Sequence, residues 1–435
     1  MMENKKWIYL STAIANLVCL ALGVFSGILS ARLLGVQARG ELAILSYYPS
    51  LVAASCSLAF PQALSFFLSK DLPENASFAS AGVRLSLVFG LLGSLVFAFL
   101  APYTLSDSNR YLSSEVSVVC AIAVPMVVNA YLFAIHRGYR RFDWVNGLLI
   151  CSAFGYIVVI LVLWWTDLLS AYSLVLSTIL IQVCMASASM VKLGSSAIKA
   201  SADWAVYRKC LIYGFKFFFP MAAVFLYAIS DRAILITMTT VEQISYYSVA
   251  FSIAFPLSVV SETFAQLGFI EIAGSKSETQ SVELVLRRFQ IAQVVLLAAA
   301  VFILLLSEPL IRYGFGKEFL PGLAATYVLV IAMALRGLSK TLEHGLRGMN
   351  RTSPGVISSL GALLCLCLVA ALLTPSRGVE GFVIALLVAE LVGLSIFIFF
   401  VLRFARARPV QLWGIRASVI RTVAISLLRI GRSGD

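Results

Sequence analysis

The sequence predicts an all-α membrane protein with about twelve transmembrane helices in two six-helix bundles. The chain of 435 residues is 60% hydrophobic and 12% charged, whereas soluble domains carry about 25% charged residues. Its mean hydropathy is +0.95, and long apolar runs recur from one end to the other. A chain of this composition is predicted to be folded in a lipid bilayer.

The individual spans follow from the length of each apolar run. A helix needs about 20 mostly apolar residues to cross about 30 Å of hydrocarbon. Twelve segments qualify: residues 8–34, 42–69, 82–101, 116–136, 145–165, 168–191, 211–238, 245–273, 289–311, 322–345, 356–373 and 379–402. The first run is longer than the apolar core of a signal peptide, which has about 7–15 residues, so we predict a retained helix. Only the region around Asp167 separates the fifth and sixth spans, which predicts a tight hairpin.

The positive charges predict the orientation. Of the 33 Lys and Arg residues, 23 lie on the side of the N-terminus, 6 on the opposite side and 4 within spans. Because cytoplasmic loops are enriched in Lys and Arg, both termini are expected in the cytoplasm. The longest inner connection, 192–210, is basic and partly amphipathic, so we expect it to lie along the lipid headgroups. The basic tail, 404–435, is either an amphipathic surface helix or disordered.

An internal repeat is visible in the loops. Arg137-Gly138-Tyr139-Arg140-Arg141 follows the fourth span, and Arg347-Gly348-Met349-Asn350-Arg351 follows the tenth, 210 residues later. We therefore expect an N-terminal six-helix bundle at 1–195, a C-terminal six-helix bundle at 196–403 and a cytoplasmic tail at 404–435. Units with an even number of spans repeat in parallel, and transporters commonly bind their substrate between such halves.

Patterns typical of soluble enzymes and nucleotide-binding proteins are missing from the sequence. The two histidines, His136 and His344, have no recognisable nucleophile or metal-binding partners, and no G-x-x-x-x-G-K-[ST] motif occurs. We therefore expect no metal, cofactor, nucleotide or enzymatic activity. The net charge of +12 lies mostly in inner loops, so we do not expect a nucleic-acid partner.

Charged residues inside the spans are the main functional signal, because each costs about 2.5–3.5 kcal/mol at the centre of a helix. At about 100° per residue, Arg336, Lys340, Glu343 and Arg347 lie within about 60°, in one stripe that runs from the middle of the tenth span to the inner surface. The positions 210 residues earlier are mostly apolar: Met126, Ala130, Phe133 and Arg137. Two interpretations stay open, a ligand-binding stripe or snorkelling side chains with an internal Lys340–Glu343 pair.

Acidic residues also occur within the spans, namely Asp231, Glu262 and Glu390. A buried carboxylate can take up a proton, which makes these three residues candidates for ion coupling. Pairing of a glutamate with Arg or Lys across the bundle is an equal alternative. Asp231 and its neighbour Arg232 point about 100° apart, so they can neutralise different partners.

Several short motifs resemble one family of membrane proteins. They are 31–35 (ARLLG), 39–43 (RGELA), 231–235 (DRAIL), 246–250 (YYSVA) and 313–319 (YGFGKEF). In this order, over residues 8–403, they resemble the O-antigen-type polysaccharide flippases of the multidrug/oligosaccharidyl-lipid/polysaccharide exporter superfamily. The sequence departs from the family at Thr240 and Ser245, where relatives usually have Gly, which puts the turn geometry there in doubt.

The resemblance implies a flippase that exports an undecaprenyl-pyrophosphate-linked oligosaccharide across the bacterial inner membrane by alternating access. It also implies a role in O-antigen, lipopolysaccharide or exopolysaccharide synthesis. The partners that it implies are membrane lipids, a polysaccharide polymerase and a chain-length regulator. On this analogy, five cations meet the pyrophosphate or acidic sugars: Arg32, Lys216, Arg232, Arg336 and Lys340.

Three rival interpretations stay open at this point. A cation-coupled multidrug antiporter shares the architecture but generally needs a carboxylate in the first helix, and residues 8–34 contain none. A membrane polysaccharide polymerase or ligase typically has a large outer loop, and the longest one predicted here runs only from about Pro102 to Glu115. Lipid II flippases of the superfamily have further C-terminal helices, which the basic tail does not supply.

Overall fold

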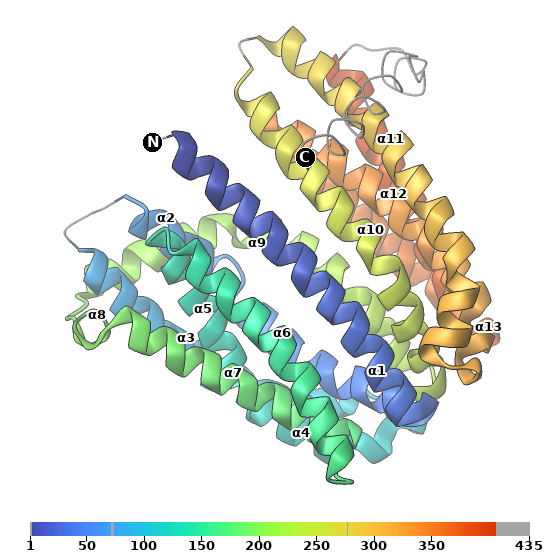
Figure 1. The fold of residues 1–435 in the computed structure, drawn as a ribbon. Coiled ribbons are helices and arrows are strands. Elements are labelled where there is room, and N and C mark those ends of the chain that lie inside the picture. The colour runs from blue at the N-terminus through green and yellow to red at the C-terminus, as the bar shows by residue number, and fades with distance from the viewer. Residues whose placement is uncertain (1, 71–73, 276, 406–435) are drawn as a thin grey trace, which may run out of the picture. The chain divides into compact units, whose positions relative to one another are not determined.

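The computed structural model describes residues 2–70, 74–275 and 277–405 (Figure 1). Within these ranges the chain forms helices and connecting turns without strands, which confirms the predicted all-α class. The predicted tail at 404–435 lies, from residue 406 on, outside the described residues.

The chain divides into two compact units. The first unit comprises the chain up to Phe225 together with Asp231–Ser248 and Gly314–Glu318. The second unit comprises Leu226–Ser230, Val249–Tyr313 and the chain from Phe319 on. Each unit is described by itself below, and the predicted bundle limits at 195 and 403 stay predictions.

The first unit is built mainly from the first nine helices. These are α1 (Met2–Cys56), α2 (Phe60–Leu68), α3 (Asn75–Leu100), α4 (Ser113–Ala121), α5 (Val124–Gly138), α6 (Phe142–Trp165), α7 (Ala171–Leu193), α8 (Ser195–Lys199) and most of α9 (Trp204–Met238). Helix α1 packs against α6 and α7, and α5 packs against α2, α3 and α7. The predicted hairpin between the fifth and sixth spans is confirmed, with Asp167 at a φ of 56° in the turn. Ser170 begins α7 with a capping box, in which its hydroxyl accepts from the Ser173 amide at 3.1 Å.

The second unit contains most of α10 (Val241–Ala273) together with α11 (Glu278–Pro309), α12 (Leu323–Gly348) and α13 (Ser353–Ala405). Helix α12 packs against both α11 and α13. A buried apolar cluster joins these helices around Phe289, Leu342 and Phe397. Close packing of this kind fixes which face of α12 points inward, and so places its charged stripe.

The number of spans agrees with the prediction. Among the described residues, nine helices are long and apolar enough to cross a membrane, and a tenth span results if the pair Asp107–Ala121 and Val124–Gly138, bent by 40°, is counted as one. Two of the nine are double length, and each is broken at a glycine with non-helical backbone, Gly35 in α1 and Gly378 in α13. Dividing α1 and α13 there gives the predicted twelve. The second predicted span, 42–69, contains a further break between α1 and α2, where Ala59 has a φ of 65°.

The predicted 210-residue register recurs in the local geometry of the two units. Arg140 and Asn350 occupy the same place in the repeat and have φ values of 59° and 60°. Their amides donate to Arg137 and Arg347, again 210 residues apart. The 3₁₀ helices at Asp107–Leu112 and Lys317–Gly322 are offset by the same number. Equal turn geometry at equal spacing supports the internal repeat.

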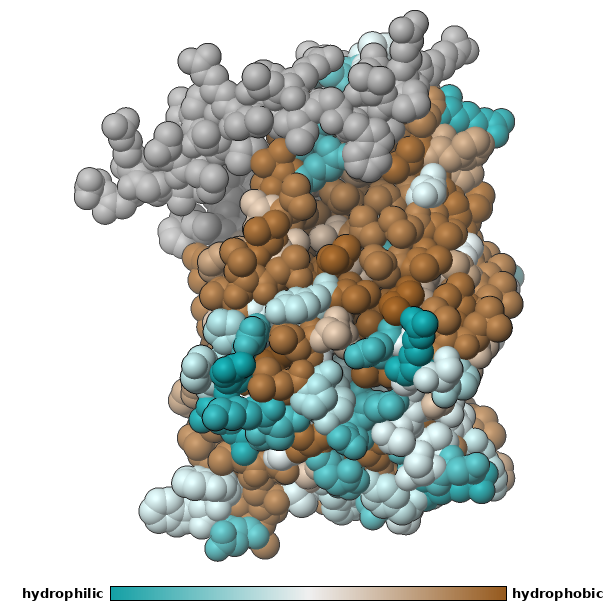
Figure 2. Space-filling view, turned by 90° about the vertical axis from the view of Figure 1, so that its right-hand side faces the viewer, coloured by the Kyte–Doolittle hydropathy of each residue, from teal (hydrophilic) through white to brown (hydrophobic). Residues whose placement is uncertain are grey.

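Much of the surface is apolar, as Figure 2 shows for one face. Exposed large side chains recur every four residues along single helix faces: Leu91, Leu95 and Phe99 on α3, Leu297, Val301 and Leu305 on α11, and Leu364, Leu368 and Leu372 on α13. Water would make such stripes costly, whereas hydrocarbon chains cover them without penalty. The protein is therefore a multi-pass membrane protein.

Candidate functional site

A buried ionic cluster lies in the second unit. Glu390 on α13 is 3% exposed. Its Oε1 accepts hydrogen bonds from Arg336 Nε on α12 and from the Tyr227 hydroxyl, each at 2.6 Å. The Arg336 guanidinium also lies over the Tyr227 ring, 5.5 Å from its centroid. A buried carboxylate and guanidinium compensate each other only when their hydrogen bonds are satisfied in this way. In the structure Glu390 is thus paired with an arginine of another helix, which is one of the two alternatives that the sequence left open.

A second group of polar and charged side chains continues along α12 toward its C-terminal end. Lys340 Nζ lies 3.8 Å from Glu262 Oε2, and His344 Nε2 lies 3.5 Å from the other oxygen of the same carboxylate. The internal Lys340–Glu343 pair considered from the sequence is wrong. Glu343 instead pairs with Arg347, one turn further along the helix. Because Glu262 belongs to α10, the Lys340 pair connects two helices rather than one.

Two further groups of the predicted residues lie in the first unit. Asp231 is 5% exposed, and its carboxylate accepts hydrogen bonds from the Tyr247 hydroxyl at 2.9 Å and from the Arg232 amide at 2.7 Å. Arg32, on α1, donates from Nε to the Gly314 carbonyl oxygen at 2.6 Å. Asp231 is therefore held by a tyrosine and by a backbone amide, and Arg32 is anchored to backbone.

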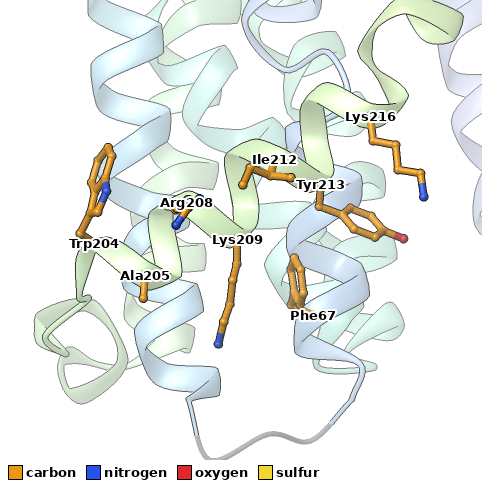
Figure 3. Close-up of a pocket in the computed structure, with 8 residues that line it drawn as sticks. All are labelled: Phe67, Trp204, Ala205, Arg208, Lys209, Ile212, Tyr213 and Lys216. Carbon is orange, nitrogen blue, oxygen red and sulfur yellow. The ribbon is translucent and has the colours of Figure 1, made fainter.

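Lys216 lies elsewhere, in a groove of about 590 Å³ between α2 and α9 (Figure 3). The residues that line this α2–α9 groove are Phe67, Trp204, Ala205, Arg208, Lys209, Ile212, Tyr213 and Lys216. All belong to the first unit. The groove combines aromatic and aliphatic walls with three cations, which suits an amphiphilic anion.

The predicted site residues therefore form separate groups. Within the second unit, Arg336 meets Glu390, and Lys340 meets Glu262. In the first unit, Arg32, Lys216 and Asp231 have the different surroundings described above, and Arg232 contributes its backbone amide to Asp231. Their roles in binding and coupling stay predictions.

Three residues of these groups were not predicted from the sequence. His344 follows Lys340 by four residues and continues the spacing of Arg336 and Lys340, so the helical period could have identified it. Tyr227 and Tyr247 carry no such signal, because tyrosines are common in membrane helices. Among the residues that the structure describes, no three His, Cys, Asp or Glu side chains are grouped for a metal ion.

A family model described as "Polysaccharide biosynthesis protein" matches residues 29–324 of the chain. No curated protein sequence matches it significantly. The fold resembles the lipid II flippase MurJ in an inward closed conformation, with a TM-score of 0.77, 16% identity, and coverage of 96% of this chain and 92% of that one. An inward-facing multidrug resistance MATE family transporter of the MOP superfamily gives a TM-score of 0.68 at 16% identity, covering 91% and 99%. The eukaryotic MATE transporter AtDTX14 gives the same score and identity, covering 96% and 99%. At such low identity, these structures establish the fold and leave the substrate open.

Proposed function

The chain belongs to the polysaccharide biosynthesis protein family, and from that premise we propose that it is a flippase. Its substrate is an undecaprenyl-pyrophosphate-linked oligosaccharide, which it moves across the bacterial inner membrane by alternating access. Family membership and the shared fold support a role in membrane transport for polysaccharide synthesis. The finer proposal rests on one observation, the cations that α12 carries inside the membrane-spanning part of the chain.

The cations of α12 suit a diphosphate, which must lose its water when it enters the membrane. Two donors one helical turn apart, Arg336 and Lys340, can meet one anionic group. In a site of low dielectric constant, fixed cations replace hydration much more effectively than they do in water. The matched helix of the first half is mostly apolar at these positions, so the fold itself does not require the charges.

Glu390 and Glu262 would control when these cations are available. With the carboxylates ionised, Arg336 and Lys340 are neutralised by protein groups. A coupling ion bound to either glutamate would remove the counter-charge and favour an anionic substrate in its place. A ligand shifts a conformational equilibrium only if it binds one conformation more tightly than the other, and a change in the counter-charge would create that difference in affinity. We therefore assign ion coupling to Glu262 and Glu390, with Asp231 of the first unit as a third carboxylate.

Three other cations complete the proposal. Arg32, Arg232 and Lys216 would contact the pyrophosphate or acidic sugars during other stages of transport. Both termini would lie in the cytoplasm, and a polysaccharide polymerase with its chain-length regulator would receive the exported unit.

A cation-coupled multidrug antiporter is the second candidate, because the fold also resembles that of MATE transporters. Buried carboxylates such as Glu390 and Asp231 favour it. Against it, residues 8–34 contain no carboxylate. A membrane polymerase or ligase is a weaker third candidate, because the loop after α3 is short.

Deletion of the gene in its host distinguishes these functions. We expect loss of surface polysaccharide, while lipid-linked repeat units accumulate on the inner leaflet, and a plasmid-borne wild-type copy should restore display. A polymerase would instead leave single repeat units on the cell surface. Normal surface glycan combined with new drug sensitivity would refute the flippase and establish the antiporter.

A further inference from the structure

The α2–α9 groove follows one face of α9. Ala205, Lys209, Ile212 and Lys216 are spaced by four, three and four residues, which places them in one row along the helix. Phe67 of α2 and Tyr213 form one part of the aromatic lining, with their ring centroids 5.3 Å apart (Figure 3). The groove is therefore a strip with an aromatic wall and cations along its length.

Within the described residues, one carboxylate forms an ion pair with the cations of the groove. Lys209 pairs with Glu74 at 3.1 Å, but both side chains are 51% exposed, and such exposed pairs contribute little. No carboxylate in the described part of the chain forms an ion pair with Arg208 or Lys216. Counted over the described residues, three cations and one carboxylate, Glu74, leave the groove with a net positive charge, which complements an anion with more than one negative charge.

The apolar residues of the groove indicate that the anion belongs to a lipid. Trp204 is 72% exposed and Ile212 is 59% exposed. Exposed Trp beside Lys and Arg is typical of a helix at the boundary between headgroups and hydrocarbon. The volume of about 590 Å³ lies within the range of about 300–1,000 Å³ that is usual for ligand-binding clefts.

The position of Lys216 favours one class of lipid. At 1.5 Å per residue, Lys209 and Lys216 lie about 10 Å apart along α9, and Figure 3 shows their side chains pointing in different directions. A glycerophospholipid with a single phosphate would satisfy one end of this row and leave the other without an anion. Two linked phosphates supply a second charge that can extend along the row.

We propose that the α2–α9 groove is the loading site for an isoprenoid diphosphate lipid before transport. The diphosphate lies along Lys209 and Lys216, with Arg208 at the same end as Lys209, and the isoprenoid chain packs on Ile212, Tyr213 and Phe67. This inference rests on the proposed function, because it gives the transported lipid a first binding site apart from the charges of α12.

Binding to the purified full-length protein tests the proposal without requiring transport. Undecaprenyl diphosphate is titrated in detergent and its complex is measured by native mass spectrometry, with phosphatidylglycerol as competitor. Lys216→Gln and Lys209→Gln remove one cation each, and both side chains are exposed, so folding should be retained. Lys199→Gln is the matched control, an exposed lysine on α8 outside the groove.

We expect Lys216→Gln and Lys209→Gln each to weaken undecaprenyl diphosphate binding about 10-fold or more, as for the loss of a charge-assisted contact. Lys199→Gln should change the affinity less than about twofold, because an exposed charge outside the groove contributes little. Wild-type affinity in Lys216→Gln, or equal competition by phosphatidylglycerol, would overturn the loading site. Neither result depends on the deletion phenotype. Groove binding in a protein whose deletion leaves glycan display intact would refute the flippase and retain the lipid site.

Discussion

At the scale of single residues, a substitution in the cluster of Arg336, Glu390 and Tyr227 changes both the charge of the cluster and the stability of the fold. Glu390 is almost fully buried, and removing its cation leaves an uncompensated charge. Breaking a buried pair in this way costs about 3–5 kcal/mol, whereas replacing both partners can be neutral. A loss of export after Arg336→Ala alone would therefore not distinguish a missing donor from a damaged fold.

The double variant Arg336→Met with Glu390→Gln makes that distinction. The side-chain amide oxygen that Glu390→Gln introduces still accepts from Tyr227. We therefore expect the melting temperature of the double variant in detergent to be close to that of the wild type, and that of Arg336→Met alone to be lower. Export should fail in both, while Arg336→Lys should retain part of it because the charge remains. Thermal unfolding and surface polysaccharide are the two readouts. Normal export by the double variant would show a structural pair, with Arg32 and Arg232 the next candidates for binding.

The hydrogen bond between Tyr247 and Asp231 gives a second test at the residue scale. Tyr247→Phe leaves a buried carboxylate without its hydroxyl donor, which should cost about 1–3 kcal/mol of stability. The neighbouring Tyr246 bonds the exposed Glu242 at 2.6 Å, so Tyr246→Phe should have little effect. Equal melting temperatures for the two variants would contradict a stabilising role for the Asp231 contact.

At the scale of elements, the break in α1 converts one 55-residue helix into two spans. Gly35 has a φ of 73° and a ψ of −177°, a conformation that is essentially confined to glycine. Arg39 reaches back across the break and donates to the Ser30 hydroxyl at 2.9 Å. The position of the break therefore determines where the side chains of Arg39 and Arg32 lie.

Replacing Gly35 by alanine isolates this conformational requirement. A Cβ added there meets no atom within 4 Å, and the same holds at Gly23 in the same helix, where the backbone is helical. Gly35→Ala should therefore destabilise by about 1–3 kcal/mol through backbone strain alone. Gly23→Ala should leave the melting temperature unchanged or slightly raised, since alanine favours helix. A similar effect of both substitutions on thermal unfolding in detergent would argue against strain at Gly35.

At the scale of the whole molecule, the topology of the chain is the most direct prediction. Asp107→Cys should react with a membrane-impermeant maleimide in intact cells, whereas Gly194→Cys should react only after permeabilisation. The reason is the excess of Lys and Arg on the loops that include residue 194. A parent protein without the exposed Cys151, Cys184 and Cys367 provides the background. Labelling of Gly194→Cys from outside would reverse the predicted orientation.

The sequence by itself determined the membrane class, the twelve spans and the 210-residue register. Each depends on local properties, namely the apolar length that the bilayer demands and the turn geometry that a short motif encodes. Helical periodicity likewise placed Arg336 and Lys340 on one face. Only the tertiary structure decided their partners, because Glu390 lies 54 residues from Arg336 and 163 from Tyr227. Lys340 could have paired with Glu343 on its own helix, but Glu343 is held by Arg347, and α10 brings Glu262 to Lys340. Which charges compensate each other depends on which helices pack together, and that packing is not encoded in any local pattern.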